Sequence, residues 1–556
     1  MKKIAFFSVC TGAALVACSS NTVVHVSGTP GADGGMSEVD SGPVPTGPAC
    51  TVMKEGTAGL LLRGTVLGPD AVISTGEVLV DSKGIITCVD VSCASAAGAG
   101  DATVLDCTHG VISPSLINTH DHIDYSGSPP VPHGTERYDH RNDWRTGKNG
   151  HAALSPKPTA TTNKATVLAA ELRFVMSGAT STVSSGGQPG LLRNLASSTQ
   201  LEGINIPAVR FDTFPLGDSN GVEIPSGCAY PSLPTSSDLA GGHYFPHIAE
   251  GVNASAHNEL VCLSAGNAND VVQAKTSIIH SIAITATDAK LYKDRGSSVV
   301  WSARTNISLY GDTAPVTLLK EAGVPITLGT DWLPSGSMNM LRELACADSL
   351  NTNYFHNAFT DQELWKMVTS NAAAATGADA VIGQLKVGYV ADIAVYANQG
   401  RAQYRAVIGA SPEDVALVLR GGKVLYGDDT IVGSAGVGGD KCEQFDVCGV
   451  KKRACVSQDT AGAQTLAAVQ AAAGYPLVFC GSPPDKEPSC VPYRDSYPNG
   501  TSATDRDGDG VLDADDDCAD VFNPARPFDA GKQSDIDGDG KGDACDRCPL
   551  DKTDGC

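Results

Sequence analysis

The pattern of apolar and polar positions divides the chain into a strand-rich start, an alternating middle and a polar end. Short β-branched runs separated by glycine, such as 59–67, predict strands of a small β-sandwich over 56–112. Similar runs return far along the chain, for example at 385–396, within a second strand-rich segment over 381–436. Strands before and after a long middle segment predict one composite domain that both flanks close.

The middle segment, 113–380, alternates apolar runs with helical stretches. Runs such as 277–282 and 324–331 predict strands, whereas 164–174 and 313–322 predict helices. Repeated strand–helix units in this order predict an α/β fold, a (β/α)8 TIM-type barrel. The active residues of such a barrel lie at the carboxyl ends of its strands.

Composition and charge narrow the class of protein. The chain has 62 Asp and Glu against 39 Lys and Arg, a formal net charge of −23, which disfavours nucleic acid as a partner. Apolar residues make up 42% of the chain, enough for a buried core. No run after the amino-terminal segment reaches the length of a spanning helix, so the body is expected to be soluble.

The first residues have the charged and apolar regions of a secretory signal. The tetrapeptide Leu-Val-Ala-Cys that ends at Cys18 resembles the lipobox of bacterial lipoproteins. That resemblance implies a signal peptide over 1–17, acylation of Cys18 and a membrane anchor. Ser19 favours the outer membrane, so the expected location is extracytoplasmic, at the outer membrane or cell surface of a Gram-negative bacterium. Residues 18–55 are expected to form a flexible tether.

Cysteine usage agrees with export. Of the 18 cysteines, Cys10 leaves with the signal and Cys18 takes the lipid, so an even number remains for disulfides in an oxidising compartment. Their connectivity stays open. The residues 437–500 form a Cys-rich segment.

Histidines and one aspartate follow apolar runs of the predicted barrel. His120 and His122 are two apart, so a strand presents both imidazoles on one face. His247, His280 and Asp331 each close or follow a later run, where a barrel strand delivers them to the same mouth. Together they indicate a metal centre.

This order and spacing resembles the amidohydrolase superfamily over about 56–430. The motif His247-x-x-Glu250 and the pair Thr305-Asn306 resemble its mononuclear, deaminase-like branch. The resemblance implies that one divalent transition metal is held by His120, His122, His247 and Asp331. A second metal usually needs a bridging lysine, and no lysine occurs between Lys164 and Lys275. Asp212 as a substitute bridge is not favoured.

Three imidazoles and a carboxylate suit zinc, with iron as second choice, and leave room for a water. Glu250 lies three residues past a ligand and is the expected proton shuttle. His280 resembles the superfamily residue that holds the water or the polarised oxygen of the substrate. Asp331 is expected to act as both ligand and base.

The expected function is hydrolysis of carbon–nitrogen bonds other than peptide bonds in a small-molecule substrate, a cyclic amidine or amide-like compound. An amidase or dipeptidase of the same fold is the alternative enzyme, and a catalytically degenerate calcium-binding surface protein is the alternative class. The polar stretch 140–145 departs from the deaminases and predicts a lid or pocket wall. Arg141 and Arg145 there could clamp an anionic group, although a solvated loop is the favoured interpretation.

The end of the chain, 501–556, contains two runs of alternating aspartates with glycine at the sixth place, which is typical of calcium loops. A cysteine follows each run and a Glu is missing at the twelfth position, so they resemble thrombospondin type 3 repeats. The predicted calcium ligands are Asp505, Asp507, Asp509, Asp513, Asp535, Asp537, Asp539 and Asp543.

Overall fold

The structure is a computed structural model, and it describes residues 47–239, 242–481 and 483–556. The predicted signal segment 1–17, the lipidation site Cys18 and most of the predicted tether lie outside the described residues. Among the residues that are described, none of the helices has both the length and the apolar character that crossing a bilayer requires.

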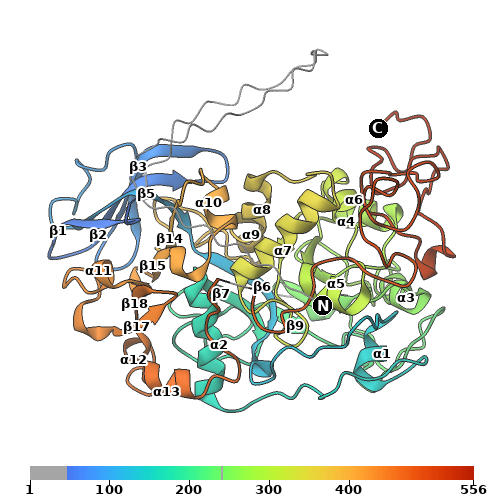
Figure 1. The fold of residues 1–556 in the computed structure, drawn as a ribbon, viewed down its shortest axis with the longest axis horizontal. Coiled ribbons are helices and arrows are strands. Elements are labelled where there is room, and N and C mark those ends of the chain that lie inside the picture. The colour runs from blue at the N-terminus through green and yellow to red at the C-terminus, as the bar shows by residue number, and fades with distance from the viewer. Residues whose placement is uncertain (1–46, 240–241, 482) are drawn as a thin grey trace, which may run out of the picture. The chain divides into compact units, whose positions relative to one another are not determined.

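Strands from both flanking segments share one sheet, in which blue amino-terminal and orange carboxyl-terminal strands lie side by side (Figure 1). Its strands are β1 (Thr51–Lys54), β2 (Leu60–Leu67), β3 (Val72–Val80), β4 (Ile86–Asp90), β5 (Thr103–Pro114), β14 (Ile393–Ala397), β15 (Val415–Arg420), β16 (Lys423–Asp428), β17 (Glu443–Val447) and β18 (Val450–Ala454). Nine of them form one hydrogen-bonded path because the long strand β5 pairs in parallel with β2 and antiparallel with β14, and β1 branches from this path by pairing with β5. Leu62, Leu105, Ile393 and Leu417 share one apolar core, so the two ends of the domain depend on each other.

The middle of the chain forms two parallel sheets. One has the order β6 (Leu116–His122), β7 (Ala179–Ser185) and β8 (Arg193–Asn194). The other has the order β13 (Ile326–Leu328), β12 (Ser298–Trp301), β11 (Ser277–His280), β10 (Tyr244–Ile248) and β9 (Arg210–Asp212). A parallel bridge between Asp121 and Asp331 connects the end of β6 to the segment after β13. The fold is therefore mixed α/β with parallel sheets, and closure into a (β/α)8 barrel stays a prediction.

Helices separate and cover these strands. They are α1 (Arg141–Thr146), α2 (Lys164–Met176), α3 (Ala254–Leu263), α4 (Ala286–Arg295), α5 (Ala303–Tyr310), α6 (Val316–Glu321), α7 (Met340–Asn353), α8 (Asp361–Met367) and α9 (Ser370–Thr376), with the short α10 (Arg405–Ile408), α11 (Asp429–Val432), α12 (Val456–Asp459) and α13 (Leu466–Ala471). Five short 3-10 turns add η1 (Ile123–Tyr125), η2 (Ser236–Leu239), η3 (Pro412–Asp414), η4 (Gly439–Lys441) and η5 (Pro527–Asp529). Local chemistry sets the helix starts: the Asn163 side chain accepts hydrogen bonds from two amides of the first turn of α2. The two helices predicted at 164–174 and 313–322 correspond to α2 and α6.

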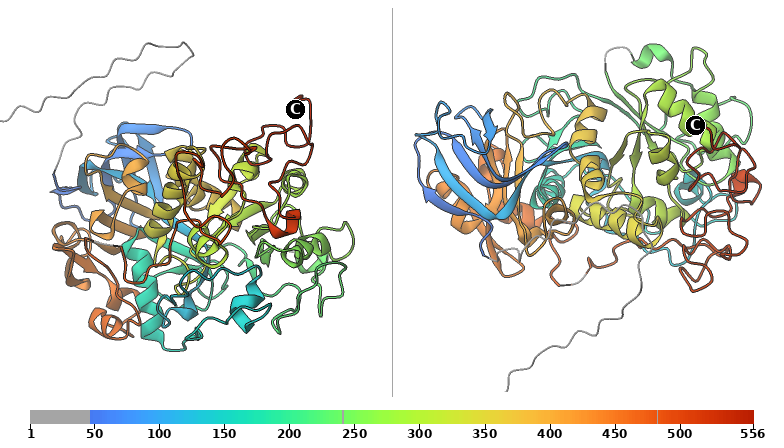
Figure 2. Two further views of the ribbon diagram at one scale, coloured as in Figure 1. Left: turned by 45° about the vertical axis from the view of Figure 1, so that its right-hand side comes forward. Right: turned by 90° about the horizontal axis from the view of Figure 1, so that it is seen from above.

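Eight disulfides pair all 16 cysteines of the described residues, which confirms the prediction of disulfides. The pairs are Cys50–Cys107, Cys88–Cys93, Cys228–Cys262, Cys346–Cys490, Cys442–Cys455, Cys448–Cys480, Cys518–Cys545 and Cys548–Cys556. Beyond residue 483, the described chain has η5 as its only regular element and runs alongside the green helices (Figure 2). Cross-links therefore hold a segment that has little regular backbone structure of its own.

Candidate active site

Four side chains converge at the carboxyl ends of the parallel strands. His120 and His122 lie on β6, His247 lies on β10, and Asp331 follows β13. Each offers one ligand atom, and these atoms all lie within 4.8 Å of one another. His120 Nε2 lies 2.8 Å from Asp331 Oδ1, and His122 Nε2 lies 3.3 Å from His247 Nε2. The structure therefore brings together the four residues predicted to be metal ligands.

Backbone contacts hold Asp331 against β6. Its amide donates to the His120 carbonyl at 3.0 Å, and the His122 amide donates to the Asp331 carbonyl at 2.6 Å. Asp331 adopts a left-handed φ of 63°, a strained conformation that costs about 1–3 kcal/mol and is common at functional sites. A Cβ on Gly329 would lie 2.6 Å from the Cβ of His120, so only glycine permits this close approach.

Hydrogen bonds behind the cluster orient two of its imidazoles. His247 Nδ1 donates to the main-chain oxygen of Asp212 at 3.0 Å, which leaves the lone pair on Nε2. His122 Nδ1 lies 3.2 Å from Ser185 Oγ, and that hydroxyl donates to Asp124 Oδ1 at 2.6 Å. The two Nε2 atoms therefore face the cluster.

The side chain of Asp212 points elsewhere. Its carboxylate accepts a hydrogen bond from Tyr244 OH at 3.1 Å and pairs with Arg210 at 3.3 Å. It is not among the four converging side chains. Three imidazoles and one carboxylate around a single point form a donor set that fits one zinc-like ion.

Burial keeps the imidazoles neutral. It lowers the pKa of His120 and His247 well below the usual value, and the neighbouring imidazoles lower both further. Burial also lowers the pKa of His122, against the opposing effect of the Asp331 carboxylate. Neutral rings keep the lone pairs that a metal needs.

A carboxylate and a fourth imidazole lie beside the ligand cluster. Glu250 is only 4% exposed, and its Oε1 accepts a hydrogen bond from Tyr310 OH at 2.6 Å. His280 Nε2 lies 3.5 Å from Glu250 Oε2, while His280 Nδ1 pairs with Asn306 Oδ1 at 3.1 Å. His280 Nε2 is buried and has no hydrogen-bond partner, so it is available to a substrate or a water. Glu250 and His280 thus adjoin the cluster, and Asp331, the third predicted catalytic residue, is one of its members.

Tyr310 is a site residue to which the sequence analysis gave no role. It lies on α5, four residues after Asn306, and positions four apart share one helix face. That spacing was the only sequence signal, and it does not identify Glu250 as the partner. Trp144 Nε1 donates to the Tyr310 hydroxyl at 2.9 Å and so fixes its orientation.

A cavity of about 470 Å³ opens over this cluster. Five site residues line it, His122, His247, Glu250, His280 and Asp331. Four aromatic residues, Tyr125, Trp144, Phe214 and Trp332, contribute to its walls beside polar and charged groups. The Trp144 and Trp332 rings lie 5.2 Å apart between centroids, and Arg145 and Lys157 contribute cationic groups to the lining. The cavity therefore offers flat apolar surfaces to a ring and polar groups at its base.

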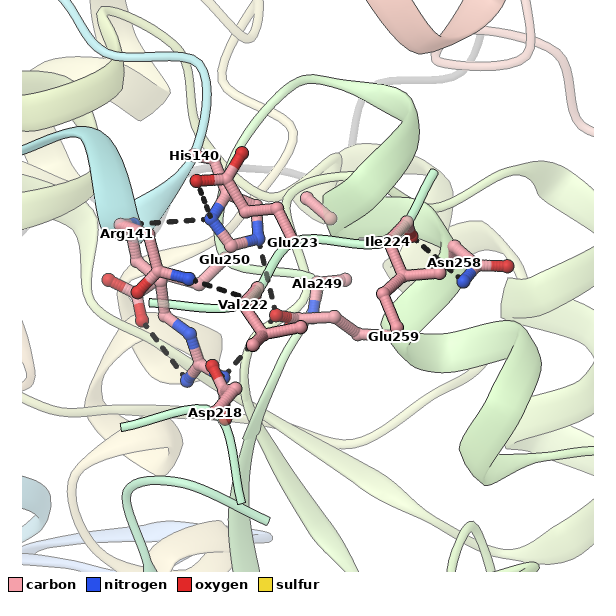
Figure 3. A network of polar contacts seen from close by, with 12 residues as sticks. His140, Arg141, Asp218, Val222, Glu223, Ile224, Ala249, Glu250, Asn258 and Glu259 are labelled. Carbon is pink, nitrogen blue, oxygen red and sulfur yellow. Dashed lines mark hydrogen bonds and ion pairs between the residues drawn. The ribbon is translucent and has the colours of Figure 1, made fainter. Parts of the chain in front are cut away.

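Arg141 belongs to a buried polar network (Figure 3). Its Nη2 donates to Asp218 Oδ2 at 2.7 Å and lies 3.3 Å from Glu259 Oε1, while its Nη1 lies 3.9 Å from Glu250 Oε2. Burial by itself lowers the pKa of Arg141. The carboxylates of Glu259 and Asp218 outweigh this effect and raise that pKa above its usual value. Arg141 is 1% exposed, so the interpretation as a solvated loop is wrong for this residue, because two acids neutralise it inside the protein. Arg145 stacks over Phe214 instead.

The protein therefore has a mixed α/β fold, in which the buried carboxylate of Glu250 lies beside a cluster of four side chains that could hold a metal ion. Residues 259–426 match the amidohydrolase family. This segment contains His280 and Asp331, whereas His120, His122 and His247 precede it.

Curated relatives agree with that match. A 5-methylthioadenosine/S-adenosylhomocysteine deaminase from Halobacterium salinarum is 34% identical over 122 residues, 21% of this chain and 28% of the relative. The protein of that name from Thermococcus kodakarensis is 30% identical over 168 residues, 28% of this chain and 38% of the relative. The matches thus span well under half of the length of these relatives. They support the amidohydrolase superfamily.

Solved structures that match part of this chain include an adenosine deaminase from Xanthomonas campestris with bound zinc. It is 16% identical, with a TM-score of 0.45, and the match covers 66% of this chain and 92% of that one.

Proposed function

We propose that the protein is a metal-dependent hydrolase of carbon–nitrogen bonds other than peptide bonds, with deaminase-like chemistry. The observation that carries the proposal is the placement of Glu250 and His280 beside four converging side chains, three of which line the same cavity as this pair. The family match over 259–426 and the deaminase relatives support it. A degenerate fold would be expected to have lost a ligand, and all four are in place.

The residues fit one divalent metal, zinc as first choice and iron as second, held by His120, His122, His247 and Asp331. Such an ion supplies Lewis acidity, which makes a water a better nucleophile near neutral pH. The buried, unpartnered Nε2 of His280 faces the same space, where it can hold that water or the substrate oxygen.

Glu250 is the proton carrier in this proposal. Its carboxylate accepts a proton from the attacking water as the new carbon–oxygen bond forms. It then delivers that proton to the leaving nitrogen as the carbon–nitrogen bond breaks. The Tyr310 hydroxyl, 2.6 Å from Oε1, holds the carboxylate in one rotamer, so Oε2 stays beside His280. Asp331 is a second acceptor that the strained backbone presents at the cavity floor.

The aromatic walls favour a planar substrate. Tyr125 and Trp332 lie 5.4 Å apart between ring centroids, and Trp144 packs against Trp332. Aromatic side chains that line a cavity bind flat groups by stacking or edge contacts. We therefore propose a cyclic amidine or amide-like compound as the substrate class.

A metal analysis combined with a substrate screen tests this function. We expect the purified protein to bind about one transition-metal ion tightly, because the described residues contain one cluster of three histidines and an aspartate, and Asp212 points away from it. A screen of purines, pyrimidines, cyclic imides and N-acyl amino acids should show ammonia release with a ring substrate. Two bound ions, or none after zinc reconstitution, would contradict the single-metal site. Turnover of N-acyl amino acids alone would favour the amidase alternative.

We also propose that the end of the chain binds calcium. Asp505, Asp507 and Asp509 form one cluster of possible ligands, and Asp535, Asp537 and Asp539 form another. Asp507 is 1% exposed and its Oδ2 has no hydrogen-bond partner, so this carboxylate lacks the compensation that burial demands. Burial, with the adjacent Asp509 and Asp516, raises the pKa of Asp507 to about 8. A hard cation would supply the missing partner.

Two of the predicted calcium ligands, Asp513 and Asp543, lie outside both clusters. Asp513 accepts a hydrogen bond from the Arg506 amide at 2.9 Å and pairs with the Arg506 guanidinium. Asp543 accepts hydrogen bonds from the Ile536 amide and the Ser534 hydroxyl. Neither belongs to a converging cluster. In this structure they close the loops rather than join the candidate ligands.

Removing calcium is expected to loosen 501–556 first. Without the cation, the aspartate carboxylates within each loop repel one another. The histidine-rich cluster does not use calcium, so its part of the fold should stay in place. Limited proteolysis with a calcium-selective chelator should cut within 501–556 before it cuts within 113–380. Equal resistance with and without calcium would argue against the loops.

We propose an extracytoplasmic location as well. Eight disulfides, all formed within the described residues, suit an oxidising compartment, and the resemblance of the segment ending at Cys18 to a lipobox suits a lipid anchor.

A further inference from the structure

Residues 483–556, here called the tail, contact the part of the molecule that holds Glu250. Cys490 is bonded to Cys346 on α7, which fixes the start of the tail. Further along, the amide of Phe528 donates to the carbonyl of Val252, two residues after Glu250. The red tail runs beside the green helices in Figure 2. The tail therefore reaches the surroundings of the candidate active site.

Arg526 of the tail makes a buried, bidentate ion pair. Its Nε and Nη2 donate to the two oxygens of Asp312 at 2.7 and 2.9 Å, and Nη2 also donates to the carbonyl of Thr313 at 3.1 Å. Asp312 is 1% exposed. Two parallel charge-assisted hydrogen bonds fix both the position and the direction of the chain that follows α5.

Arg494 of the tail binds the end of the same helix. Its Nη1 donates to the carbonyl of Tyr310, the last residue of α5, at 2.7 Å, and its Nη2 pairs with Asp139. A cation here satisfies a carbonyl that the helix leaves unpaired and also complements the helix dipole. A Cβ on Gly311 would lie 2.0 Å from the carbonyl oxygen of Tyr493, so glycine allows the tail backbone to approach.

Helix α5, whose carboxyl end these two arginines contact, also carries partners of both Glu250 and His280. Tyr310 donates its hydroxyl hydrogen to Glu250 at 2.6 Å, and Asn306 on the same helix contacts His280 at 3.1 Å. A shift of the end of α5 would therefore move both partners of the predicted catalytic pair.

We propose that Arg494 and Arg526 are positioning residues for Glu250, and that they act by holding the carboxyl end of α5. This inference rests on the proposed function, because it assumes that Glu250 carries the proton. It adds that a segment outside the family match, which ends at residue 426, forms part of the working site.

Methionine substitutions with a matched control test the proposal. Arg526→Met and Arg494→Met are each expected to lower kcat by ~10- to 100-fold with little change in KM, because small misplacement of a catalytic group is costly while the cavity walls stay in place. Arg547→Met is the control: this tail arginine is exposed, lies beyond both aspartate runs, and should leave kcat unchanged. Arg494→Met covers the case in which Arg526→Met fails to fold, since its partner Asp139 is partly exposed.

Three further measurements separate positioning from general stability. Hydrogen exchange of the amides in 303–313 should quicken in Arg494→Met and Arg526→Met and not in Arg547→Met. In a Tyr310→Phe background, Arg494→Met should lower kcat by a much smaller factor than in the native background. Both changes interrupt the same connection, from Arg494 through Tyr310 to Glu250. Arg526→Lys, which keeps the charge but not the bidentate geometry, should restore part of kcat.

The outcomes distinguish this inference from the proposed function. If the native protein hydrolyses no compound of the screen, the proposed function fails, and the exchange of 303–313 still decides whether the tail holds α5. Unchanged exchange in Arg494→Met and Arg526→Met would overturn the inference. If the double variant lost kcat by the product of the factors measured for Arg494→Met and Tyr310→Phe alone, that result would overturn the inference as well.

Discussion

Replacing Glu250 with glutamine is expected to lower kcat by roughly 10²- to 10⁴-fold while leaving the metal and the fold in place. Glutamine has the same shape and can still accept the hydrogen bond that Tyr310 donates at 2.6 Å. It cannot accept a proton near neutral pH, which is the step assigned to this residue. The measurement is kcat on a substrate from the screen, with elemental analysis and a melting temperature of the same sample.

Tyr310→Phe provides a graded comparison for Glu250→Gln. It removes the hydroxyl that orients the carboxylate but keeps the carboxylate itself, so its loss in kcat should be smaller. A Glu250→Gln protein with near-native kcat and unchanged metal content would refute the proton-carrier role.

Replacing His247 with alanine should remove the metal as well as the activity. His247 Nε2 is one of four ligand atoms within 4.8 Å of one another, and alanine leaves only two imidazoles and a carboxylate. We expect the metal affinity to fall by more than the roughly 10- to 100-fold typical of an outer-shell partner. Titration with zinc against a competing chelator measures this affinity, and a lower melting temperature at fixed zinc should accompany its loss.

The matched control for His247→Ala is Ser185→Ala. Ser185 Oγ contacts His122 Nδ1 at 3.2 Å and is not a ligand, so its removal should weaken metal binding about 10- to 100-fold and leave one metal at saturation. His247→Ala and Glu250→Gln should therefore differ in kind: the first loses metal, the second loses only turnover. Full metal occupancy in His247→Ala would contradict the ligand set.

The relative placement of site residues that are close in sequence could be predicted, because strand geometry fixes which side chains share a face. His120 and His122 fall on one face of β6 for the same reason that any residues two apart do. His247, His280 and Asp331 were recognisable because each closes or follows an apolar run, and parallel strands bring their carboxyl ends to one edge. The strand–helix alternation likewise predicted the parallel sheets, and an even number of cysteines predicted disulfides without their pairing.

Other features depend on contacts that no local pattern encodes. Glu250 and Tyr310 are 60 residues apart, and Arg526 and Asp312 are 214 apart, so no helix or strand period relates them. Arg141 is another example. Its charge favoured a position in solvent, but in the folded protein Arg141 is buried between Asp218 and Glu259, which are distant in sequence.

The sequence by itself determined the α/β class, the ligand types and their attachment to strand ends, because the periods of helices and strands act over a few residues. Only the tertiary structure decided which hydroxyl orients Glu250, which groups neutralise Arg141 and how the tail meets α5. Those pairings depend on the packing of distant segments, where distance and burial set the strength of each contact.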